Sequence, residues 1–345
     1  MAAGARAELG LRDERGLAHR DVVVVGASAG GVEALTAFVQ RVPPELPASV
    51  FVVLHLLATG TSVLHSILAR AGRLPTSLAV DGERYERGHI YVARPDHHLL
   101  IGEDRIILSS GPRENGHRPA IDPLFRSAAR ALGPRVIAVV LSGSLDDGAA
   151  GTRFVKERGG LAIVQAPDDA LYSTMPEAAA SATDVDYVGP VSAIPGVLCS
   201  ALEREIKPEE FERASNAERP PLQEEAEGTP STLTCPDCGG ALWEHDEGRF
   251  VRFSCRTGHA YSPESLATEQ GNALETALWS ALRSLEERAD LLQRMQRRAG
   301  GGVSGERFGT RIRAIDQHAQ AIRDAIEHLG FADRATNGDR GGGQA

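Results

Sequence analysis

Short apolar runs alternate with amphipathic segments through residues 21–198 of the 345-residue chain. Unbroken apolar runs are typical of strands buried on both faces of a parallel sheet, whereas apolar residues spaced three and four apart are typical of helices. The runs predict strands at 22–25, 49–54, 89–93, 105–108, 136–141 and 161–164. The helical spacing predicts helices at 32–41, 62–71, 121–132 and 149–157. This alternation predicts an α/β domain with a doubly wound, mostly parallel sheet.

One pair of runs breaks the alternation, because no helical segment separates residues 89–93 from residues 99–108. Parallel neighbours need a long crossover connection, whereas antiparallel neighbours are joined by a tight turn. We therefore expect these two runs to form an antiparallel hairpin that is inserted in the sheet or lies at its edge.

The first predicted strand leads into a glycine-rich turn with the sequence GASAGG at positions 26–31, followed by a helical segment. The pattern Gly-x-Ser-x-Gly matches the nucleophile elbow of serine hydrolases. A glycine-rich turn after an early strand is also how dinucleotide-binding folds begin, although here Ser28 replaces the middle glycine of that motif. From this motif alone, Ser28 is a nucleophile, part of a phosphate cradle or a residue of a structural turn.

Three further polar residues lie at or just after the ends of predicted strands. His55 closes the second strand, and Asp146 and Asp147 follow the strand at 136–141. Considered one at a time, these residues have ordinary structural explanations. A histidine at the end of a strand is typical of the protein surface, and an aspartate in such a loop is typical of a turn or a helix cap. In an open α/β sheet, however, the carboxyl ends of the strands share one edge, where ligands bind. Ser28, His55 and an aspartate would converge there as nucleophile, base and orienting carboxylate.

A second candidate site lies in the C-terminal half, where Cys235, Cys238, Cys255 and His259 have the spacing C-x2-C-x16-C-x3-H. This spacing is typical of a zinc ribbon, which we expect over residues 231–266. Because four protein ligands leave no open coordination position, the predicted Zn²⁺ is structural and not catalytic. A redox-active Cys-x-x-Cys pair is the alternative, and the presence of the second cysteine–histidine pair disfavours it.

Two apolar stripes follow the predicted ribbon, separated by the glycines at 300–302. The first stripe consists of Leu274, Leu278, Ala281, Leu285 and Leu292. The second consists of Phe308, Ile312, Ile315, Ala319, Ile322, Ile326 and Leu329. Together they predict an antiparallel helical hairpin over residues 267–332. The pattern leaves three roles open for the outer face of this hairpin: packing within the chain, docking on a receptor, or forming a homodimer.

Composition narrows the class of protein. A net charge of −10 argues against nucleic acid as the main partner. No apolar run is long enough for insertion through a membrane, and the charged residues 1–20 lack the apolar segment of a secretory signal. We therefore expect a cytoplasmic protein, in which cysteines favour metal binding or free thiols, including Cys199, over disulfides. We expect disorder at 1–20 and 333–345 and a linker at 199–230.

Five motifs in residues 21–198 occur together in one order. They are GASAGG at 26–31, the strand that ends in His55, GHIYVA at 88–93, HRP at 117–119 followed by Asp122, and LSG at 141–143 followed by DGA at 147–149. Together they resemble the catalytic domain of the chemotaxis protein-glutamate methylesterases, the CheB family. The resemblance implies a doubly wound domain with a Ser-His-Asp triad that hydrolyses γ-glutamyl methyl esters on chemoreceptor helices and releases methanol. Some members of that family also deamidate receptor glutamines.

Carried over by motif, the resemblance implies that Ser28 is the nucleophile, His55 the general base and Asp147 the orienting carboxylate. It favours Asp147 over Asp146 because the family's aspartate directly precedes a glycine, here Gly148. It implies no cofactor for catalysis.

The chain departs from the family's pattern in the loops around these residues. Ala29 stands where members often have threonine, Leu54 stands where a glutamine usually precedes the histidine, and residues 142–145 read SGSL in place of Thr-Gly-Met-Gly. Oxyanion donors near Ala29 and Ser144 would survive these replacements if they are backbone amides. Each such donor is typically worth about 10²- to 10³-fold in rate.

The family's usual N-terminal receiver domain, which covers the active site until it is phosphorylated, has no counterpart among the residues before the first strand. We therefore expect control by the C-terminal half or by another protein, such as a methyltransferase or a separate regulator. The predicted partners are methylated chemoreceptor cytoplasmic helices. Two alternatives stay open: a dinucleotide-binding protein, and a non-catalytic adaptor that binds a receptor or a methyltransferase through the methylesterase-like domain, the ribbon and the hairpin.

Overall fold

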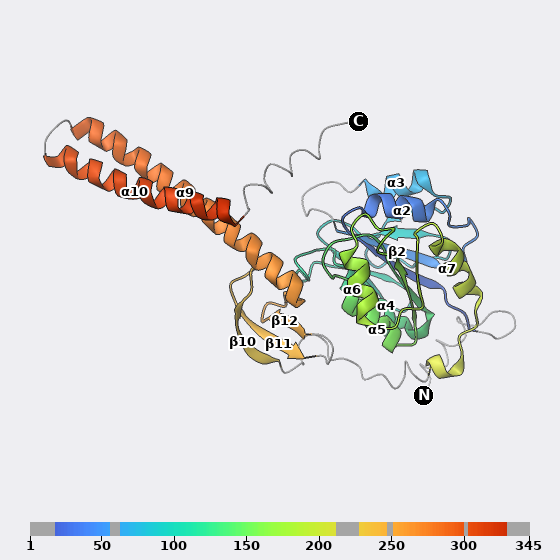
Figure 1. The fold of residues 1–345 in the computed structure, drawn as a ribbon. Coiled ribbons are helices and arrows are strands. Elements are labelled where there is room, and N and C mark those ends of the chain that lie inside the picture. Colours follow the sequence, from blue (N-terminus) through green and yellow to red (C-terminus); the bar gives the residue numbers. More distant parts are fainter. Residues whose placement is uncertain (1–17, 56–62, 212–227, 247–250, 300–302, 330–345) are drawn as a thin grey trace. The chain divides into compact units, whose positions relative to one another are not determined.

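The computed structural model describes residues 18–55, 63–211, 228–246, 251–299 and 303–329 (Figure 1). The predictions for the two chain ends fall largely outside these ranges, as does half of the predicted linker, residues 212–227. The chain divides into two compact units, Met1–Leu266 and Ala267–Ala345. None of the described helices combines the length and the apolar character needed to cross a membrane.

A seven-stranded sheet forms the centre of the first unit, and all of its neighbouring strands are parallel. Its strands, in order across the sheet, are β3 (Thr76–Leu78), β4 (Ile90–Val92), β2 (Ser49–Leu54), β1 (Val22–Ala27), β7 (Val136–Val140), β8 (Leu161–Gln165) and β9 (Tyr187–Gly189). The sheet therefore grows outward from β1 in both directions, which confirms the predicted doubly wound α/β fold.

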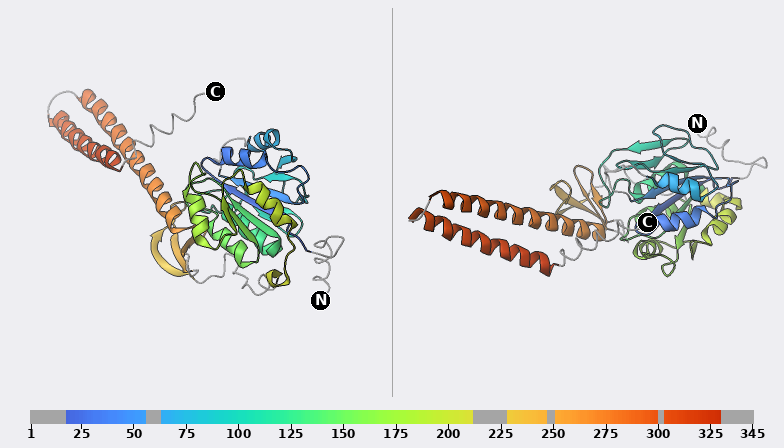
Figure 2. Two further views of the ribbon diagram at one scale, coloured as in Figure 1. Left: turned by 45° about the vertical axis from the view of Figure 1, so that its right-hand side comes forward. Right: turned by 90° about the horizontal axis from the view of Figure 1, so that it is seen from above.

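Helices cover both faces of this sheet (Figures 1 and 2). One face packs against α2 (Gly31–Val39), α3 (Leu64–Ala71) and α7 (Ile194–Glu203). The other packs against α4 (Ile121–Leu132), α5 (Ala149–Glu157) and α6 (Thr174–Ala182). Successive valines of β1 alternate between these two cores: Val23 and Val25 lie in the first, Val22 and Val24 in the second. The unbroken valine run therefore reflects burial of the strand on both faces.

The predicted pairing of residues 89–93 with residues 99–108 was wrong. β4 lies inside the main sheet, where it pairs in parallel with β2 and β3. The antiparallel hairpin consists instead of β5 (His98–Ile101) and β6 (Ile106–Ser109), which form a separate two-stranded sheet. All three residues of β4 are buried, which is the burial expected of a central strand and not of a sheet edge.

Elements of the sheet and its covering helices that were not predicted include β3, β9, α6 and α7. The strands among them are only partly buried, so their residues do not form apolar runs. Helix α7 extends to Glu203, past residue 198, where the linker was predicted to begin.

A small antiparallel sheet follows within the first unit. Its strands are β10 (Thr229–Thr234), β11 (Ala241–Asp246), β12 (Val251–Cys255) and β13 (Ala260–Tyr261). Its buried core consists of Cys235, Leu242, Phe253, Cys255, Tyr261 and Leu266. We call this sheet with its two cysteine-bearing loops the ribbon.

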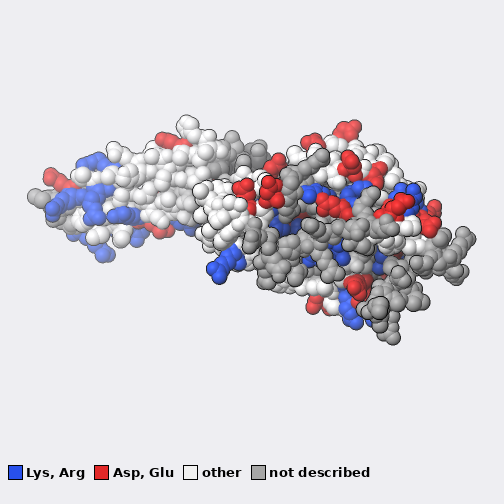
Figure 3. Space-filling view, turned by 90° about the horizontal axis from the view of Figure 1, so that it is seen from below, with Lys and Arg blue, Asp and Glu red and all other residues white. Residues whose placement is uncertain are grey.

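Two long helices follow, α9 (Pro263–Ala299) and α10 (Val303–His328), which run side by side in opposite directions (Figure 2). Residues of the second predicted stripe fill their contact, but on α9 Leu282 and Ala289 are buried while Leu274 and Ala281 are exposed. Figure 3 shows basic side chains gathered toward the end where α9 gives way to α10. Exposed arginines in that part are Arg294, Arg297, Arg298, Arg307 and Arg311.

Candidate active site

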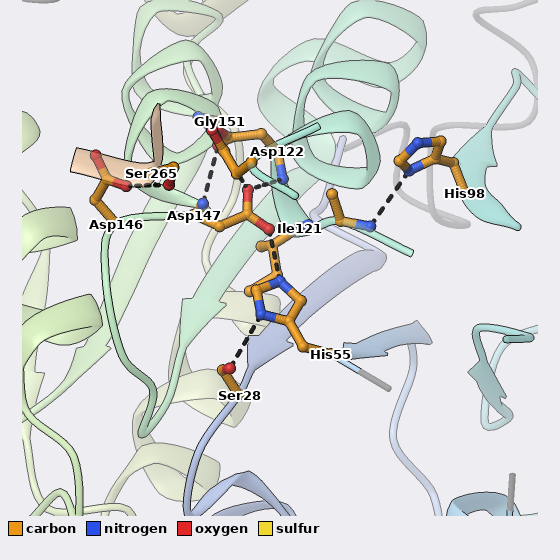
Figure 4. Close-up of polar contacts among 12 residues, drawn as sticks. Ser28, His55, His98, Ile121, Asp122, Asp146, Asp147, Gly151 and Ser265 are labelled. Atoms are coloured by element: carbon orange, nitrogen blue, oxygen red, sulfur yellow. Dashed lines mark hydrogen bonds and ion pairs between the residues drawn. The ribbon is translucent and has the colours of Figure 1, made fainter. Parts of the chain in front are cut away.

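The three predicted catalytic side chains come from the carboxyl ends of three neighbouring strands (Figure 4). Ser28 follows β1, His55 follows β2, and Asp147 lies in the loop between β7 and α5. Since β2 and β7 flank β1 on opposite sides, the strand order reverses at β1. Open α/β sheets bind their ligands outside the strand ends at such a reversal.

Ser28 lies at the sharp turn from β1 into α2. Its amide donates to the Ser142 carbonyl at 2.9 Å, and its carbonyl accepts from the Gly31 amide at 2.8 Å. Gly30 has a φ of 69°, a left-handed conformation that glycine adopts without steric cost. A Cβ on Gly26 would lie 2.5 Å from a methyl carbon of Ile121. The two glycines of the motif therefore serve the turn and the close packing of α4 on the strand.

The three side chains form one chain of hydrogen bonds. The Ser28 hydroxyl oxygen lies 3.0 Å from His55 Nδ1, and His55 Nε2 lies 2.7 Å from Asp147 Oδ2. When Nε2–H donates to the carboxylate, a neutral imidazole presents Nδ1 as the acceptor for the hydroxyl proton. His55 and Asp147 have almost completely buried side chains, whereas Ser28 is half-buried. The arrangement is that of a nucleophile activated by an oriented base, with the hydroxyl at its accessible end.

Known proteins share this domain. The family model described as CheB methylesterase matches residues 23–198, which is half of the chain. This chain belongs to the CheB methylesterase family. The match confirms the family resemblance indicated by the motifs.

Individual relatives match about half of the chain. A putative protein-glutamate methylesterase/protein-glutamine glutaminase of Leptospira interrogans is 37% identical over 169 residues, which are 49% of this chain and 88% of the relative. Protein-glutamate methylesterase/protein-glutamine glutaminase 2 of Anaeromyxobacter dehalogenans is 38% identical over 55% of this chain and 57% of its own length. The crystal structure of the Thermotoga maritima CheB methylesterase catalytic domain matches with a TM-score of 0.50 and 31% identity, covering 52% of this chain and 98% of that one.

Asp147 has several donors besides His55 in this CheB-family domain. Its carboxylate accepts the amides of Ile121 at 2.6 Å and Asp122 at 3.2 Å, and Asn115 Nδ2 at 3.0 Å. Burial opposes ionisation, but the hydrogen bond and charge of His55 and the Ile121 amide outweigh it, so the pKa of Asp147 lies well below its ordinary value. An ionised carboxylate at this position can hold the imidazole in one tautomer.

Asp122 is a second buried carboxyl group beneath the site, and its pKa shifts in the opposite direction. Its Oδ1 accepts the amides of Gly148 at 3.1 Å and Gly151 at 2.6 Å. Burial and then the negative charge of Asp147 raise the pKa of Asp122 well above its ordinary value. The pKa values of these two neighbouring carboxyl groups therefore shift in opposite directions, and of the two only Asp147 contacts the histidine.

Asp146, the alternative triad carboxylate, is directed toward Ser265 in the first turn of α9 (Figure 4). Its Oδ1 accepts hydrogen bonds from the hydroxyls of Ser262 at 2.7 Å and Ser265 at 3.0 Å. The geometry therefore brings Asp147, and not Asp146, into contact with His55.

A turn at residues 114–117 contacts both the histidine and the aspartate of the triad, and the sequence analysis assigned it no role. Asn115 and Gly116 have φ values of 52° and 76°, the left-handed pair of a type I′ turn. The His117 ring stacks on His55 with centroids 3.7 Å apart and planes within 14°. Burial and then the charge of His55 lower the pKa of His117 to about 4, so a neutral ring supports His55. The Asn-Gly dipeptide signals such a turn, but not its place beside the triad.

The predicted oxyanion donors lie in the two loops beside Ser28. Ala29 follows the serine directly, and Ser144 follows Gly143, where an added Cβ would lie 3.0 Å from Ser28 Cβ. The Gly143 amide donates to the Tyr172 carbonyl at 3.0 Å. The hydrogen bonds found among the described residues assign no acceptor to the amides of Ala29 and Ser144. Their role as oxyanion donors stays a prediction.

The four predicted metal ligands converge at one end of the ribbon, and their ligand atoms all lie within 4.8 Å of one another. Cys238 Sγ lies 3.7 Å from Cys255 Sγ, and Nδ1 of His259 lies 3.5 Å and 3.6 Å from the sulfurs of Cys255 and Cys235. These three separations are close to the roughly 3.6–3.8 Å between ligand atoms of a tetrahedral Zn²⁺ site, so the cluster could hold a metal ion. Cys199 lies outside the set, half-buried on α7, and burial raises the pKa of its thiol.

Proposed function

We propose that this chain is a serine esterase that hydrolyses γ-methyl esters of glutamate side chains on chemoreceptors and releases methanol. The observation that carries the proposal is the hydrogen-bonded chain from Ser28 through His55 to Asp147, in a domain of the CheB methylesterase family. The relatives' names, protein-glutamate methylesterase/protein-glutamine glutaminase, supply the substrate class and add deamidation of glutamine as a second reaction of the same site.

The reaction follows from the position of each proton. His55 Nδ1 takes the hydroxyl proton as Ser28 Oγ attacks the ester carbonyl, and the amides of Ala29 and Ser144 stabilise the resulting oxyanion. The imidazolium then returns the proton to the departing methoxide, which leaves as methanol, and an acyl-enzyme ester remains. Water activated by His55 attacks this ester and releases the glutamate carboxylate. Asp147 stays ionised throughout and stabilises the imidazolium form.

Cys235, Cys238, Cys255 and His259 would hold a structural Zn²⁺ in the ribbon. Support comes from the donor set, three sulfurs and one imidazole whose ligand atoms lie within 4.8 Å of one another, and from the small core that the ribbon buries. When bound, the ion would supply cross-linking and stability to the ribbon, and it would not contact the reacting atoms of the ester. The partners on this proposal are methylated chemoreceptor cytoplasmic helices, which places the enzyme in the cytoplasm.

Methanol release from a carboxyl-methylated receptor fragment tests the function. We expect Ser28→Ala to lower the turnover by at least about 10⁴-fold, because the nucleophile is lost. Ser200→Ala is the matched control, since this exposed serine on α7 bonds only to the Gly196 carbonyl of its own helix. Ordinary turnover by Ser28→Ala would refute the nucleophile assignment. If neither protein releases methanol, labelling of Ser28 by a serine-reactive phosphonate distinguishes an enzyme given the wrong receptor from a non-catalytic adaptor.

A further inference from the structure

Asn115 connects the ribbon to the triad carboxylate. Its Nδ2 donates to Asp147 Oδ1 at 3.0 Å, and its Oδ1 accepts the amide of Ser262 at 2.9 Å. Its own amide donates to the carbonyl of Ala260 at 2.8 Å. The side chain and the backbone of this buried residue are therefore bonded to the ribbon on one side and to Asp147 on the other.

Asn115 has a φ of 52°, the left-handed conformation that a type I′ turn requires and that asparagine adopts more readily than most residues. The preceding residue, Glu114, is buried and forms an ion pair with Arg126 of α4 at 2.7 Å. The turn is thus anchored to α4 at one residue and to the ribbon at the next. His117, at the end of the same turn, stacks on His55.

A second set of contacts joins the ribbon to the residue before Asp147. The Ser262 and Ser265 hydroxyls donate to Asp146 Oδ1. Ser262 also begins α9: its hydroxyl accepts the amide of Ser265 at 3.1 Å, and its carbonyl accepts the amide of Leu266 at 2.9 Å. This is the geometry of a helix N-cap, which places a carboxylate at the positive end of the helix.

The segment that makes these contacts directly follows a metal ligand, because Ala260 is next to His259 in the chain. The amide of Cys255 donates to the His259 carbonyl at 3.0 Å, which closes the second ligand loop. Gly258 in that loop packs on Pro112 so closely that a Cβ would lie 2.9 Å from Pro112 Cγ. The metal cluster and the contacts to Asn115 are therefore parts of one continuous structure.

We propose that the metal-loaded ribbon positions the triad carboxylate, with Asn115 as the positioning residue that connects them. Metal in the Cys₃His cluster holds residues 260–262 against Asn115, and Asn115 in turn holds Asp147 in line with His55. Loss of the metal would release residues 260–262 and leave Asn115 without its ribbon partners. The inference rests on the proposed role of Asp147 as the orienting carboxylate, and it makes the ribbon a control element for the esterase site.

The first test compares variants of the full chain in their rate of labelling by a fluorophosphonate, which reports activation of Ser28 without a receptor. Asn115→Gly removes the side chain but tolerates the left-handed backbone. We expect it to slow labelling by about 10- to 100-fold, the size of one hydrogen bond to a charged group. In methanol release it should lower kcat and leave KM unchanged, since Asn115 acts through Asp147. Labelling within about twofold of the unmodified chain would overturn the proposal.

A matched pair of serine substitutions on α9 tests the second set of contacts. Ser265→Ala removes a donor to Asp146 and should slow labelling several-fold, whereas Ser284→Ala, whose hydroxyl bonds only to the Ser280 carbonyl, should leave the rate unchanged. Equal rates for the two variants would show that the contact to Asp146 has no effect on the triad.

The second test removes the metal from the full chain with a chelator and then restores it with Zn²⁺. Two readouts are followed, the labelling rate and the downfield proton NMR resonance of the His55 N–H that donates to Asp147. We expect both to decline on metal removal and to return with one equivalent of Zn²⁺, and the resonance should respond in the same way in Ser28→Ala. Retention of both in the metal-free protein would overturn the proposal. If both respond to metal but no methanol is released from the receptor, the proposed substrate is wrong and the coupling stands.

Discussion

The sheet domain and the ribbon lie in one compact unit but differ in what stabilises them. Each face of the large sheet is covered by helices, and the strands β1, β2 and β7 between them are completely buried. Among its described residues the core of the ribbon holds six buried side chains, and two of these belong to the predicted metal ligands Cys235 and Cys255. The first region draws its stability from apolar burial, whereas we expect the second to need the proposed Zn²⁺ to remain folded.

The adjacent residues Asp146 and Asp147 contact different regions of this unit. Asp147 accepts hydrogen bonds from His55 and from the start of α4, and so belongs to the sheet domain's site. Asp146 accepts hydrogen bonds from Ser262 and Ser265, and so belongs to the contact with the ribbon. On the two proposals above, catalysis depends on the sheet edge for placing the nucleophile and base, and on the metal-loaded ribbon for holding one side of the carboxylate.

The largest expected effect is a difference in turnover between a substitution of Asp147 and the same substitution of Asp146. Asp147→Asn should lower the turnover by about 10⁴-fold, because the amide would favour the wrong tautomer of His55. Asp146→Asn keeps an oxygen acceptor for the serine hydroxyls and should cost no more than about 10-fold. Methanol release and phosphonate labelling of both variants measure the difference. Equal losses would show that the assignment of Asp147 alone to the triad is wrong.

A smaller effect should distinguish the stability of the two regions. Leu35 in α2 and Leu242 in β11 are both completely buried. Leu35→Ala should lower the free energy of unfolding of the sheet domain by about 2–5 kcal/mol and leave metal binding unchanged. Leu242→Ala should leave the main unfolding transition in place and weaken Zn²⁺ binding instead. Urea unfolding and Zn²⁺ titration measure the two outcomes, and elemental analysis of the unmodified chain should find one zinc.

The smallest effect concerns Asp122, whose pKa is raised by burial and by Asp147. The folded chain binds this proton more tightly than the unfolded chain, in which the pKa is about 3.9. Stability from this group is therefore complete below that value and declines, by up to about 1.4 kcal/mol per pH unit, until the raised pKa is passed. Asp122→Asn lacks this decline, so its stability relative to the unmodified chain should increase with pH. Urea unfolding of both proteins at a series of pH values measures the difference in their free energy of unfolding. A difference that stays constant with pH would contradict a raised pKa for Asp122.

The local sequence pattern was sufficient to predict an element whose structure depends only on residues of its own segment. The valine run at 22–25 indicated a strand buried on both faces, and the structure shows its side chains in both cores. Helices Ile121–Leu132 and Ala149–Glu157 have the predicted bounds, because their amphipathic spacing depends only on neighbouring residues. The placement of β4 failed for the opposite reason: its neighbours, β2 and β3, come from other parts of the chain.

The sequence by itself determined the α/β class, the family and the identity of the residues that could form a triad and a metal cluster, because residue type and spacing carry that information. Only the tertiary structure decided which aspartate meets His55, that Asn115 and His117 support the triad, and that the ribbon bonds to the turn holding both. These contacts join segments up to 147 positions apart. Hydrogen bonds and ring stacking need ångström-scale alignment in space, and the packing of the whole unit provides that alignment.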